Sequence, residues 1–288
     1  MKRLWIFLFV CFLFVPLNTS ASPWTKDPGK YSVLLGAYGI FSEANFALNT
    51  FDGNYYSITS YVEGEVGLPG GFGITAHIPF VSAWHNNEQV TYQAAGMGDA
   101  MLKLQWTPRS LEEKLNFTMT LHIDAKIPMY DAGSYQNDAN LIQQGVANQY
   151  PLLGDGQVDL LFGLSGGNYW EVGAWTPFVS VMLGYIYRSD WFIGQGFPGG
   201  AVRFLPNLYF RTRGGFEWKW LSVIVGVEGN IPLGTETRAI TEGQIMLETT
   251  VSFKVRSNIS LFVSGYIGVW AVNTAVPYLA SVGLSFEG

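Results

Sequence analysis

Apolar and polar residues alternate strictly along several segments of the chain. In 116–127 an apolar side chain occupies every second position, and mostly polar side chains occupy the positions between them. Segments 207–218 and 244–255 repeat the pattern. A period of two residues is typical of a β-strand with one apolar face and one polar face. The sequence therefore predicts an all-β protein built from amphipathic strands.

Over the whole chain, the alternation predicts about twelve strands separated by turns and loops. We expect them at 31–41, 54–68, 72–81, 98–107, 116–127, 157–165, 176–187, 207–218, 221–231, 244–255, 259–269 and 278–286. Short turns such as 69–71 and 219–220 alternate with longer connections, of which 128–156 is the longest. This alternation is typical of outer-membrane barrels, whose periplasmic turns are short and whose extracellular loops are long.

Alternating strands alone fit two architectures. In a soluble sandwich the apolar face points to a core, whereas in a membrane barrel it points to lipid and the polar face lines the lumen. Tryptophan positions favour the barrel, because these side chains gather at membrane interfaces. One set lies beside the short turns and a second just past the opposite strand ends: Trp106, Trp175, Trp218 and Trp220, and then Trp84, Trp191 and Trp270.

Composition supports the same conclusion. Of the 288 residues, 48% are hydrophobic, 16% aromatic and 13% charged, so the chain is too apolar to stay disordered. After the N-terminal apolar run, no stretch approaches the roughly 20 consecutive apolar residues that a spanning helix needs. We therefore expect a single transmembrane antiparallel up-and-down β-barrel formed by residues 22–288.

The N-terminus predicts export. Lys2 and Arg3 precede the apolar run 4–17, and small polar residues follow it, so residues 1–21 form a predicted signal peptide. Its removal takes away the only cysteine, Cys11, and with it disulfides and thiolate chemistry. Removal also changes the formal net charge from −6 to −8, which argues against a nucleic-acid partner. The predicted location is the outer membrane of a Gram-negative cell.

Charged residues on the strands are the candidates for function. A charge on the lipid face costs about 2–4 kcal/mol at the bilayer midplane, so we expect the strand charges to face the lumen. They are Glu63, Glu65, Asp99, Lys103, Asp124, Lys126, Arg211, Arg213, Glu217, Glu228, Glu248 and Lys254. Acids and bases are nearly balanced. One hypothesis is that they form ion pairs that brace the wall, and the other is a mixed-charge constriction that selects solutes.

The residues singled out for the lumen or for selectivity are Asp99, Lys103, His122, Asp124, Lys126, Arg211, Arg213 and Glu248. The first five belong to the consecutive strands 98–107 and 116–127, which should form one hairpin. We therefore expect Asp99 and Lys103 to neighbour the three candidates on the second strand. Asp99 is expected either to cap loop amides or to meet a basic partner such as Lys126.

Catalytic chemistry has little support in the sequence. His77, His85 and His122 do not stand at metal-ligand spacing from one another. Outer-membrane phospholipases also have about twelve strands and use a Ser–His pair, but their His-x-Ser-Asn-Gly signature has no match here. His122 and Asp124 share a strand face, so a base with an orienting carboxylate is geometrically possible. We expect no enzyme activity, no metal site and no cofactor.

The run Gly96-Met97-Gly98-Asp99-Ala100-Met101-Leu102 resembles a Gly-x-Gly-Asp-x-x-Leu strand opening found in the outer-membrane proteins named for a MetA pathway of phenol degradation. Lys126-Ile127-Pro128 and Leu153-Gly154-Asp155-Gly156 are similar to that family's layout. The resemblance implies a barrel that passes hydrophobic or aromatic compounds across the outer membrane, and it transfers no binding residue. Independently, we expect Gly96 and Gly98 to adopt unusual backbone dihedrals as the chain leaves a loop.

The predicted function is an outer-membrane, porin-like channel or transporter for small molecules, hydrophobic or aromatic ones included. The alternative is a non-conducting barrel whose long loops have a surface-binding or structural role. Both stay open, because a barrel of about twelve strands lies between filled barrels of about eight and open porins of about sixteen.

Several expectations follow from this function. Loop 128–156 is apolar enough to fold inward and narrow the pore. The expected partners are outer-membrane lipids, the barrel-assembly machinery and small-molecule solutes. The strand count could be ten, twelve or fourteen, and monomer is the default oligomeric state.

Overall fold

The computed structural model describes residues 25–42, 54–86, 90–110, 117–130, 143, 153, 157–192, 203–234, 239–240, 243–272 and 278–288. The predicted signal peptide lies outside these residues, so its cleavage stays a prediction. In the part of the chain that the structure describes, no helix is long and apolar enough to cross a membrane.

The strands are β1 (Tyr31–Ser42), β2 (Asn54–Leu68), β3 (Phe72–Asn86), β4 (Thr91–Met97), β5 (Asp99–Trp106), β6 (Thr118–Pro128), β7 (Gln157–Tyr169), β8 (Trp175–Phe192), β9 (Arg203–Phe204), β10 (Asn207–Trp218), β11 (Leu221–Pro232), β12 (Ala239–Ile240), β13 (Gly243–Arg256), β14 (Ile259–Val272) and β15 (Tyr278–Glu287). Among the described residues, 13 strands form one sheet, and β9 and β12 form a separate parallel pair.

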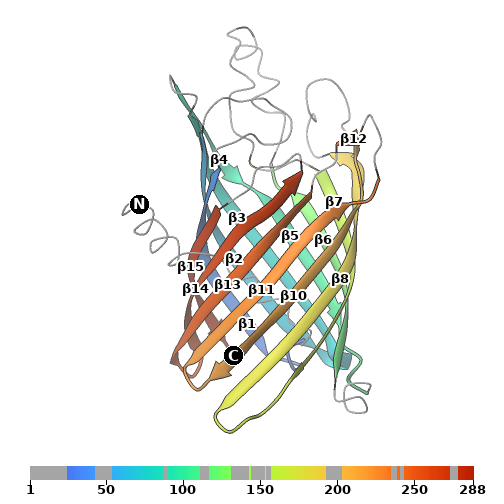
Figure 1. Cartoon of the computed structure of the whole chain (residues 1–288), viewed down its shortest axis with the longest axis vertical. Coiled ribbons are helices and arrows are strands. Elements are labelled where there is room, and N and C mark those ends of the chain that lie inside the picture. Colours follow the sequence, from blue (N-terminus) through green and yellow to red (C-terminus); the bar gives the residue numbers. More distant parts are fainter. Residues whose placement is uncertain are drawn as a thin grey trace.

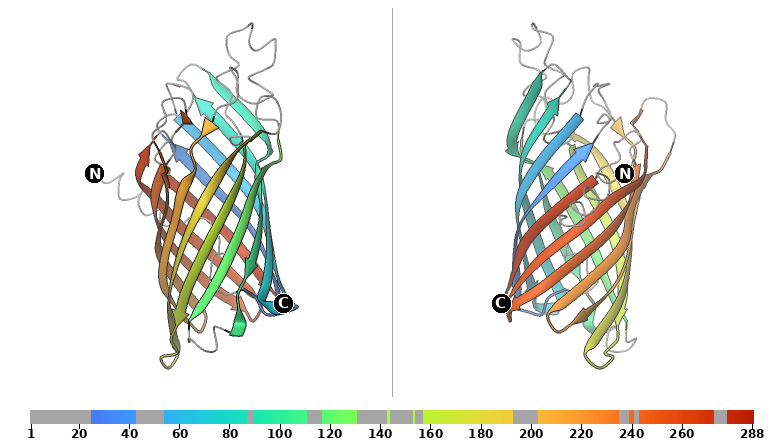
Figure 2. Two further views of the ribbon diagram at one scale, coloured as in Figure 1. Left: turned by 90° about the vertical axis from the view of Figure 1, so that its right-hand side faces the viewer. Right: turned by 60° about the vertical axis from the view of Figure 1, so that its left-hand side comes forward.

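The large sheet closes into a barrel. β1 pairs with both β2 and β15, and β2 also pairs with β3, so no edge remains at that seam. Strands that follow one another in sequence lie side by side and antiparallel, which makes the topology up-and-down (Figure 1 and Figure 2). The short turns and the C-terminus lie at one end of the barrel, which we call the short-turn end; the strand ends that lead into the longer connections lie at the other, which we call the long-loop end. Each of the predicted strands is present.

The prediction missed one strand. Segment 82–97 was expected to be a connection, but β3 continues to Asn86 and β4 begins at Thr91. β4 and β5 both pair with β3 and share one place in the wall, which gives a barrel of 12 strands with one extra strand. The sequence missed this because the alternation is interrupted at Gly98.

The interruption at Gly98 is a β-bulge. Phe80 pairs with Met97 but His77 pairs with Met101, so the β4–β5 strand contains one residue more than β3 between these pairs. Such an extra residue shifts the alternation of faces by one position. Gly98 nevertheless stays bonded on both sides, because its N–H donates to Pro79 O (3.1 Å) and its carbonyl accepts from Met129 N (3.2 Å).

Gly96 and Gly98 do not have the expected unusual dihedrals, since neither is among the glycines with positive φ. Both positions are glycine because a side chain there would crowd a neighbouring residue. A Cβ on Gly98 would lie 2.8 Å from Val81 Cγ2, and one on Gly96 would lie 3.0 Å from Leu153 Cδ1. Leu153 therefore packs on the inner wall, as expected for an inward-folded loop. The rest of 131–156, apart from Gln143, lies outside the described residues.

Burial separates the two faces and excludes the sandwich. Lipid-facing apolar residues are widely exposed, with Ile58 at 54% and Leu183 at 57%. Polar residues on the opposite face, such as Thr59, Thr75 and Glu248, are at most 2% exposed. This is the inverted arrangement of a transmembrane barrel, in which apolar side chains face lipid and polar side chains face the lumen.

Part of the lumen is filled by apolar side chains. Leu34, Tyr61 and Phe262 form a buried cluster, with Tyr38 and Ile224 packed against it; we call these five residues the apolar lumen cluster. Glycines on neighbouring strands make room for its rings. A Cβ at Gly36 would lie 2.6 Å from Tyr61 Cζ, and one at Gly283 would overlap the Phe262 ring. Glycines covered by aromatic rings in this way also help to fix register in β-sheets.

The tryptophans at the short-turn end form the expected belt. Trp175 stacks on Trp218 with ring centroids 5.4 Å apart, and Trp220 lies 5.6 Å from Trp218 and 6.0 Å from Phe253. At the long-loop end, the predicted positions of the tryptophans relative to the strand ends were wrong by a few residues. Trp84, Trp191 and Trp270 lie within β3, β8 and β14 rather than just past the strand ends, because these strands are longer than expected.

Enlarging Gly283 should destabilise the barrel. We expect Gly283→Ala to lower the free energy of unfolding by about 1–3 kcal/mol, since its methyl group must displace the Phe262 ring in a packed lumen. Gly64→Ala is the matched control, because no atom lies within 4 Å of its added Cβ. Equilibrium urea unfolding in lipid vesicles, followed by tryptophan fluorescence, measures both. Equal effects of the two substitutions would contradict the packing argument.

Candidate functional site in the barrel lumen

The hairpin of β5 and β6 brings candidate residues together as the sequence predicts. Lys103 pairs with Asp124 and Gln105 pairs with His122 across the two strands. Lys126 lies opposite Met101, and Asp99 lies opposite Pro128. The neighbourhood of the hairpin candidates is thus confirmed in its register.

A second group of candidates lies on β10, β11 and β13. Arg213 Nε donates to Glu248 Oε2 at 2.7 Å, and both side chains are buried. The pair spans from β10 to β13 across β11, at the level where Gly226 pairs with both residues. A Cβ on Gly226 would lie 2.9 Å from Arg213 Cγ, so the glycine leaves the space for this bridge. Arg211 Nη1 and Glu228 Oε2 lie 4.0 Å apart beside it.

Charges from the two groups also act on each other across the lumen. Lys103 lies within electrostatic range of Glu228 of β11 as well as of Asp124, and Arg211 of β10 lies within range of Asp124. We call Lys103, Asp124, Arg211, Arg213, Glu228 and Glu248 the mid-lumen charge cluster. Lys103 and Arg211 are each 5% exposed, so side chains fill the lumen at this level. The Arg213–Glu248 pair agrees with ion pairs that brace the wall, and solute selection by the cluster stays a prediction.

Lys126 belongs to a separate cluster nearer the long-loop end. Its Nζ lies 2.6 Å from Asp159 Oδ2, and Arg188 Nε lies 3.5 Å from the same oxygen. Asp159 belongs to β7, so Lys126 has a carboxylate partner that the sequence reading did not name, and its pairing with Asp99 stays a prediction. Asp99 also faces inward, since its charge acts on Tyr38 of β1.

The sequence reading missed Asp159 and Arg188. Asp159 alternates with apolar neighbours inside a predicted strand, so its inward position could have been found from the pattern. Arg188 was missed because the strand was expected to end at 187, whereas β8 continues to Phe192.

His122 makes contacts that differ from the pair with Asp124 that the sequence allowed. Its Nε2 lies 2.6 Å from Ser165 Oγ, and its Nδ1 lies 3.4 Å from Gln105 Nε2. Histidine and serine are both at most 3% exposed, so in this arrangement the contact braces β6 against β7 and presents no open face to a substrate. No group of three or more histidine, cysteine or acidic residues able to hold a metal ion occurs among the residues described.

The opposite wall has a different character. There Glu63 Oε2 lies 3.3 Å from His77 Nδ1, and the ring of His77 packs against Tyr61 at a centroid distance of 4.9 Å. Tyr61 joins this pair to the apolar lumen cluster. The lumen is therefore amphipathic, with mixed charges on β5, β6, β10, β11 and β13, and with buried rings and aliphatic side chains from β1, β2 and β14 beside polar residues such as Ser57, Thr59 and Ser264. Glu217 and Lys254, also predicted to face inward, are exposed near the short-turn end.

The geometry can be compared with known proteins. No protein-family description matches the chain, and no curated sequence matches it. Among solved structures, the chain is similar to the COG4313 outer membrane channel from Pseudomonas putida F1, with a TM-score of 0.67 and 12% identity, covering 93% of this chain and 98% of that one.

More distant similarities include the CymD monoaromatic hydrocarbon channel, with a TM-score of 0.45 and 6% identity, covering 91% of this chain and 89% of that one. The translocator domain of the autotransporter NalP from Neisseria meningitidis has a TM-score of 0.44 and 8% identity, with 91% and 89% covered. At these identities the likeness concerns the fold, which is that of a transmembrane β-barrel.

Removing one partner of the buried pair should be costly. We expect Glu248→Ala to reduce the free energy of unfolding by about 3–5 kcal/mol, because it leaves the Arg213 guanidinium buried without its carboxylate. The matched control is Glu287→Ala, which breaks the exposed pair of Glu287 with Lys26 and should cost about 0–1 kcal/mol. Urea unfolding in vesicles measures both, and similar costs for the two variants would show that the lumen pair is solvated.

Proposed function

We propose that the protein is an outer-membrane channel for small molecules, hydrophobic and aromatic ones included. The mid-lumen charge cluster is the observation that carries the proposal. Buried ion pairs are seldom more stabilising than well-packed apolar residues, so a barrel that only needed filling would not require them. Ionisable groups inside a membrane protein that face the interior commonly mark a solute pathway. The similarity to a solved outer membrane channel supports the same function.

The amphipathic lumen supports a solute with an apolar body and a polar group. Aromatic pairs in contact are worth about 0.5–1.5 kcal/mol beyond the area they bury, so the rings of Tyr61 and Phe262 favour an aromatic or apolar surface. The mid-lumen charge cluster opposite them offers both donors and carboxylate acceptors for a polar substituent. A strongly hydrated sugar would gain nothing from the apolar wall.

Passage requires the mid-lumen charge cluster to move, because its side chains fill the lumen at that level. We expect the refolded native barrel to show rare or small conductance steps in a planar bilayer. Conductance should rise several-fold in the double variant Arg213→Ala with Glu248→Ala, which removes two large side chains together and leaves no orphaned charge between them. The double variant Lys26→Ala with Glu287→Ala, at the exposed rim, is the control.

The alternative function is a non-conducting barrel with loops that bind surfaces or serve structure. The low exposure of the lumen charges is the observation in its favour. A folded double variant of Arg213 and Glu248 that stays silent would favour this alternative, because two of the six side chains in the mid-lumen charge cluster would then be gone without opening a path.

The apolar wall provides a separate test of the solute class. We expect Phe262→Leu to lower the ratio of benzoate to acetate uptake into liposomes by a factor of about 2–10, corresponding to the loss of one aromatic contact. Leucine keeps the site apolar, which limits the loss of stability. The control is Phe253→Leu, since Phe253 is exposed on the outer surface. An unchanged uptake ratio would remove the aromatic preference and leave the channel function standing.

A further inference from the structure

The short-turn end contains a second feature that the channel function does not use. Here the chain before β1 folds back onto the barrel wall. Gly29 N donates to Gly67 O (2.9 Å) and Gly67 N donates to Lys30 O (2.9 Å). Thr25 is buried, and its Oγ1 donates to Gly71 O at 3.3 Å. The N-terminal segment 25–30 is thus fixed against the turn between β2 and β3.

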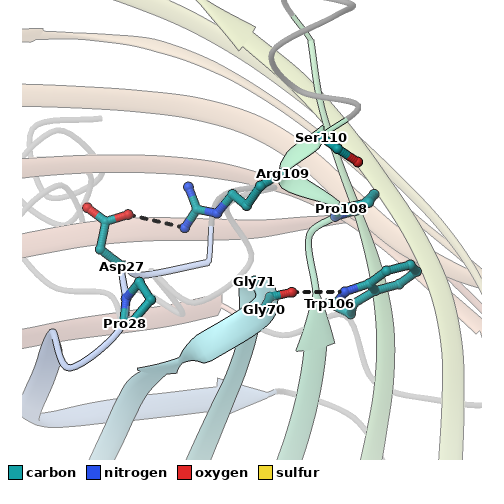
Figure 3. A pocket seen from close by; sticks show the side chains of 8 residues that line it. All are labelled: Asp27, Pro28, Gly70, Gly71, Trp106, Pro108, Arg109 and Ser110. Atoms are coloured by element: carbon teal, nitrogen blue, oxygen red, sulfur yellow. Dashed lines mark hydrogen bonds and ion pairs between the residues drawn. The ribbon is translucent and has the colours of Figure 1, made fainter.

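Arg109 ties this segment to the end of β5. Its Nη2 donates to the carbonyls of Thr25 (3.1 Å) and Lys26 (3.5 Å) and to Asp27 Oδ1 (3.2 Å). The guanidinium is thereby held in place beside a carboxylate (Figure 3). The pair is accessible to a ligand, because the Arg109 side chain is 39% exposed and that of Asp27 is 76% exposed.

A hollow of about 530 Å³ adjoins this pair. It is lined by Asp27, Pro28, Gly70, Gly71, Trp106, Pro108, Arg109 and Ser110. Its volume lies within the range of small-molecule sites, roughly 300–1,000 Å³. One side therefore offers a fixed cation and anion, and the other offers the indole of Trp106, whose Nε1 donates to Gly70 O at 3.2 Å.

Trp106 connects the hollow to the lipid-facing surface. Its ring stacks on Phe72 with centroids 6.1 Å apart, and both rings are exposed on the outside of the barrel. Leu121, which pairs with Trp106, and Leu104 extend this apolar surface along the wall. Aromatic belts of this kind mark the level of the lipid headgroups. Arg109 lies beyond the end of β5 and lines the same hollow, so the hollow spans the rim of the barrel between the lipid-facing Trp106 and the N-terminal segment.

We propose that this hollow binds one phospholipid with an amine-bearing headgroup, its phosphate on Arg109 and its ammonium on Asp27. Guanidinium groups bind phosphate through two parallel hydrogen bonds, and a carboxylate beside them suits an ammonium group. The acyl chains lie over Phe72, Trp106 and Leu104. Short turns of such barrels face the periplasm, where the membrane leaflet consists of phospholipids.

The charge arrangement makes the site selective. An aminophospholipid supplies one charge for each member of the Asp27–Arg109 pair, so both remain compensated when the ligand separates them. An anionic headgroup with hydroxyl groups, such as glycerol phosphate, supplies only the phosphate and leaves the carboxylate of Asp27 without a cation. We therefore expect phosphatidylethanolamine to bind more tightly than phosphatidylglycerol.

The test is native mass spectrometry of the full, delipidated barrel in detergent, titrated separately with phosphatidylethanolamine and phosphatidylglycerol. We expect one tight phosphatidylethanolamine per barrel, and a loss of affinity of about tenfold or more in Arg109→Ala, since this variant removes charge-assisted hydrogen bonds to the phosphate. Asp27→Asn should abolish the preference for phosphatidylethanolamine and keep phosphate binding. Arg256→Ala, at the exposed end of β13, is the control.

Two further measurements make the lipid-binding experiment decisive. Asp27→Asn is the second variant because Asp27 is mostly exposed, so it tests the site even where Arg109→Ala loosens the N-terminal segment. Phosphoethanolamine without acyl chains should bind far more weakly than the lipid. Equal binding of the two would establish a soluble phosphate ester as the ligand and overturn the lipid proposal. Equal affinities of the native barrel for the two lipids, or an unchanged Asp27→Asn preference, would overturn it as well.

Discussion

Closure of the backbone hydrogen-bond ladder is the constraint on which the rest of this structure depends. In hydrocarbon each unsatisfied N–H or C=O costs several kcal/mol, so a spanning sheet is stable only without an edge. The last residue of the chain meets the first strand, where Tyr31 N donates to Gly288 O (3.0 Å) and Gly288 N donates to Tyr31 O (3.1 Å). With the edge removed, every strand has one face in lipid and one in the lumen, and polar residues have only the lumen to occupy.

Because the inward-facing side chains of all strands share the lumen, the lumen is crowded. This crowding explains how individual side chains pack inside the barrel. Large side chains lie flat over glycines, as Tyr61 does over Gly36, because the curved wall leaves no room for two side chains at one level. The Arg213–Glu248 bridge over Gly226 uses the same solution with a salt bridge in place of a ring. Glycine in these strands therefore has a steric function, which outweighs its weak strand propensity.

The sequence predicted what depends on neighbouring residues and failed where more distant parts of the chain decide. Strand positions and the Lys103–Asp124 neighbourhood follow from alternation and one hairpin. Arg213 and Glu248 lie two strands apart, so only the register of three strands and the small size of Gly226 bring them together. The bulge at Gly98 was missed because a single inserted residue does not alter the kinds of residue that the strand contains. It nevertheless reverses the face of the sheet to which the following side chains point. Asp159 was missed as a partner of Lys126 because it comes from β7, which lies outside the β5–β6 hairpin.

Under the proposed function, the difference between the two lumen walls matters more than their individual contacts. A lumen packed only with apolar side chains would resist opening, since each displaced group would lose its full burial. Buried charges paired with neighbours are held by partners that a polar solute group can replace. The mid-lumen charge cluster thus closes the path with interactions that a solute can exchange, while the apolar lumen cluster keeps its packing and provides the surface along which the rest of the solute moves.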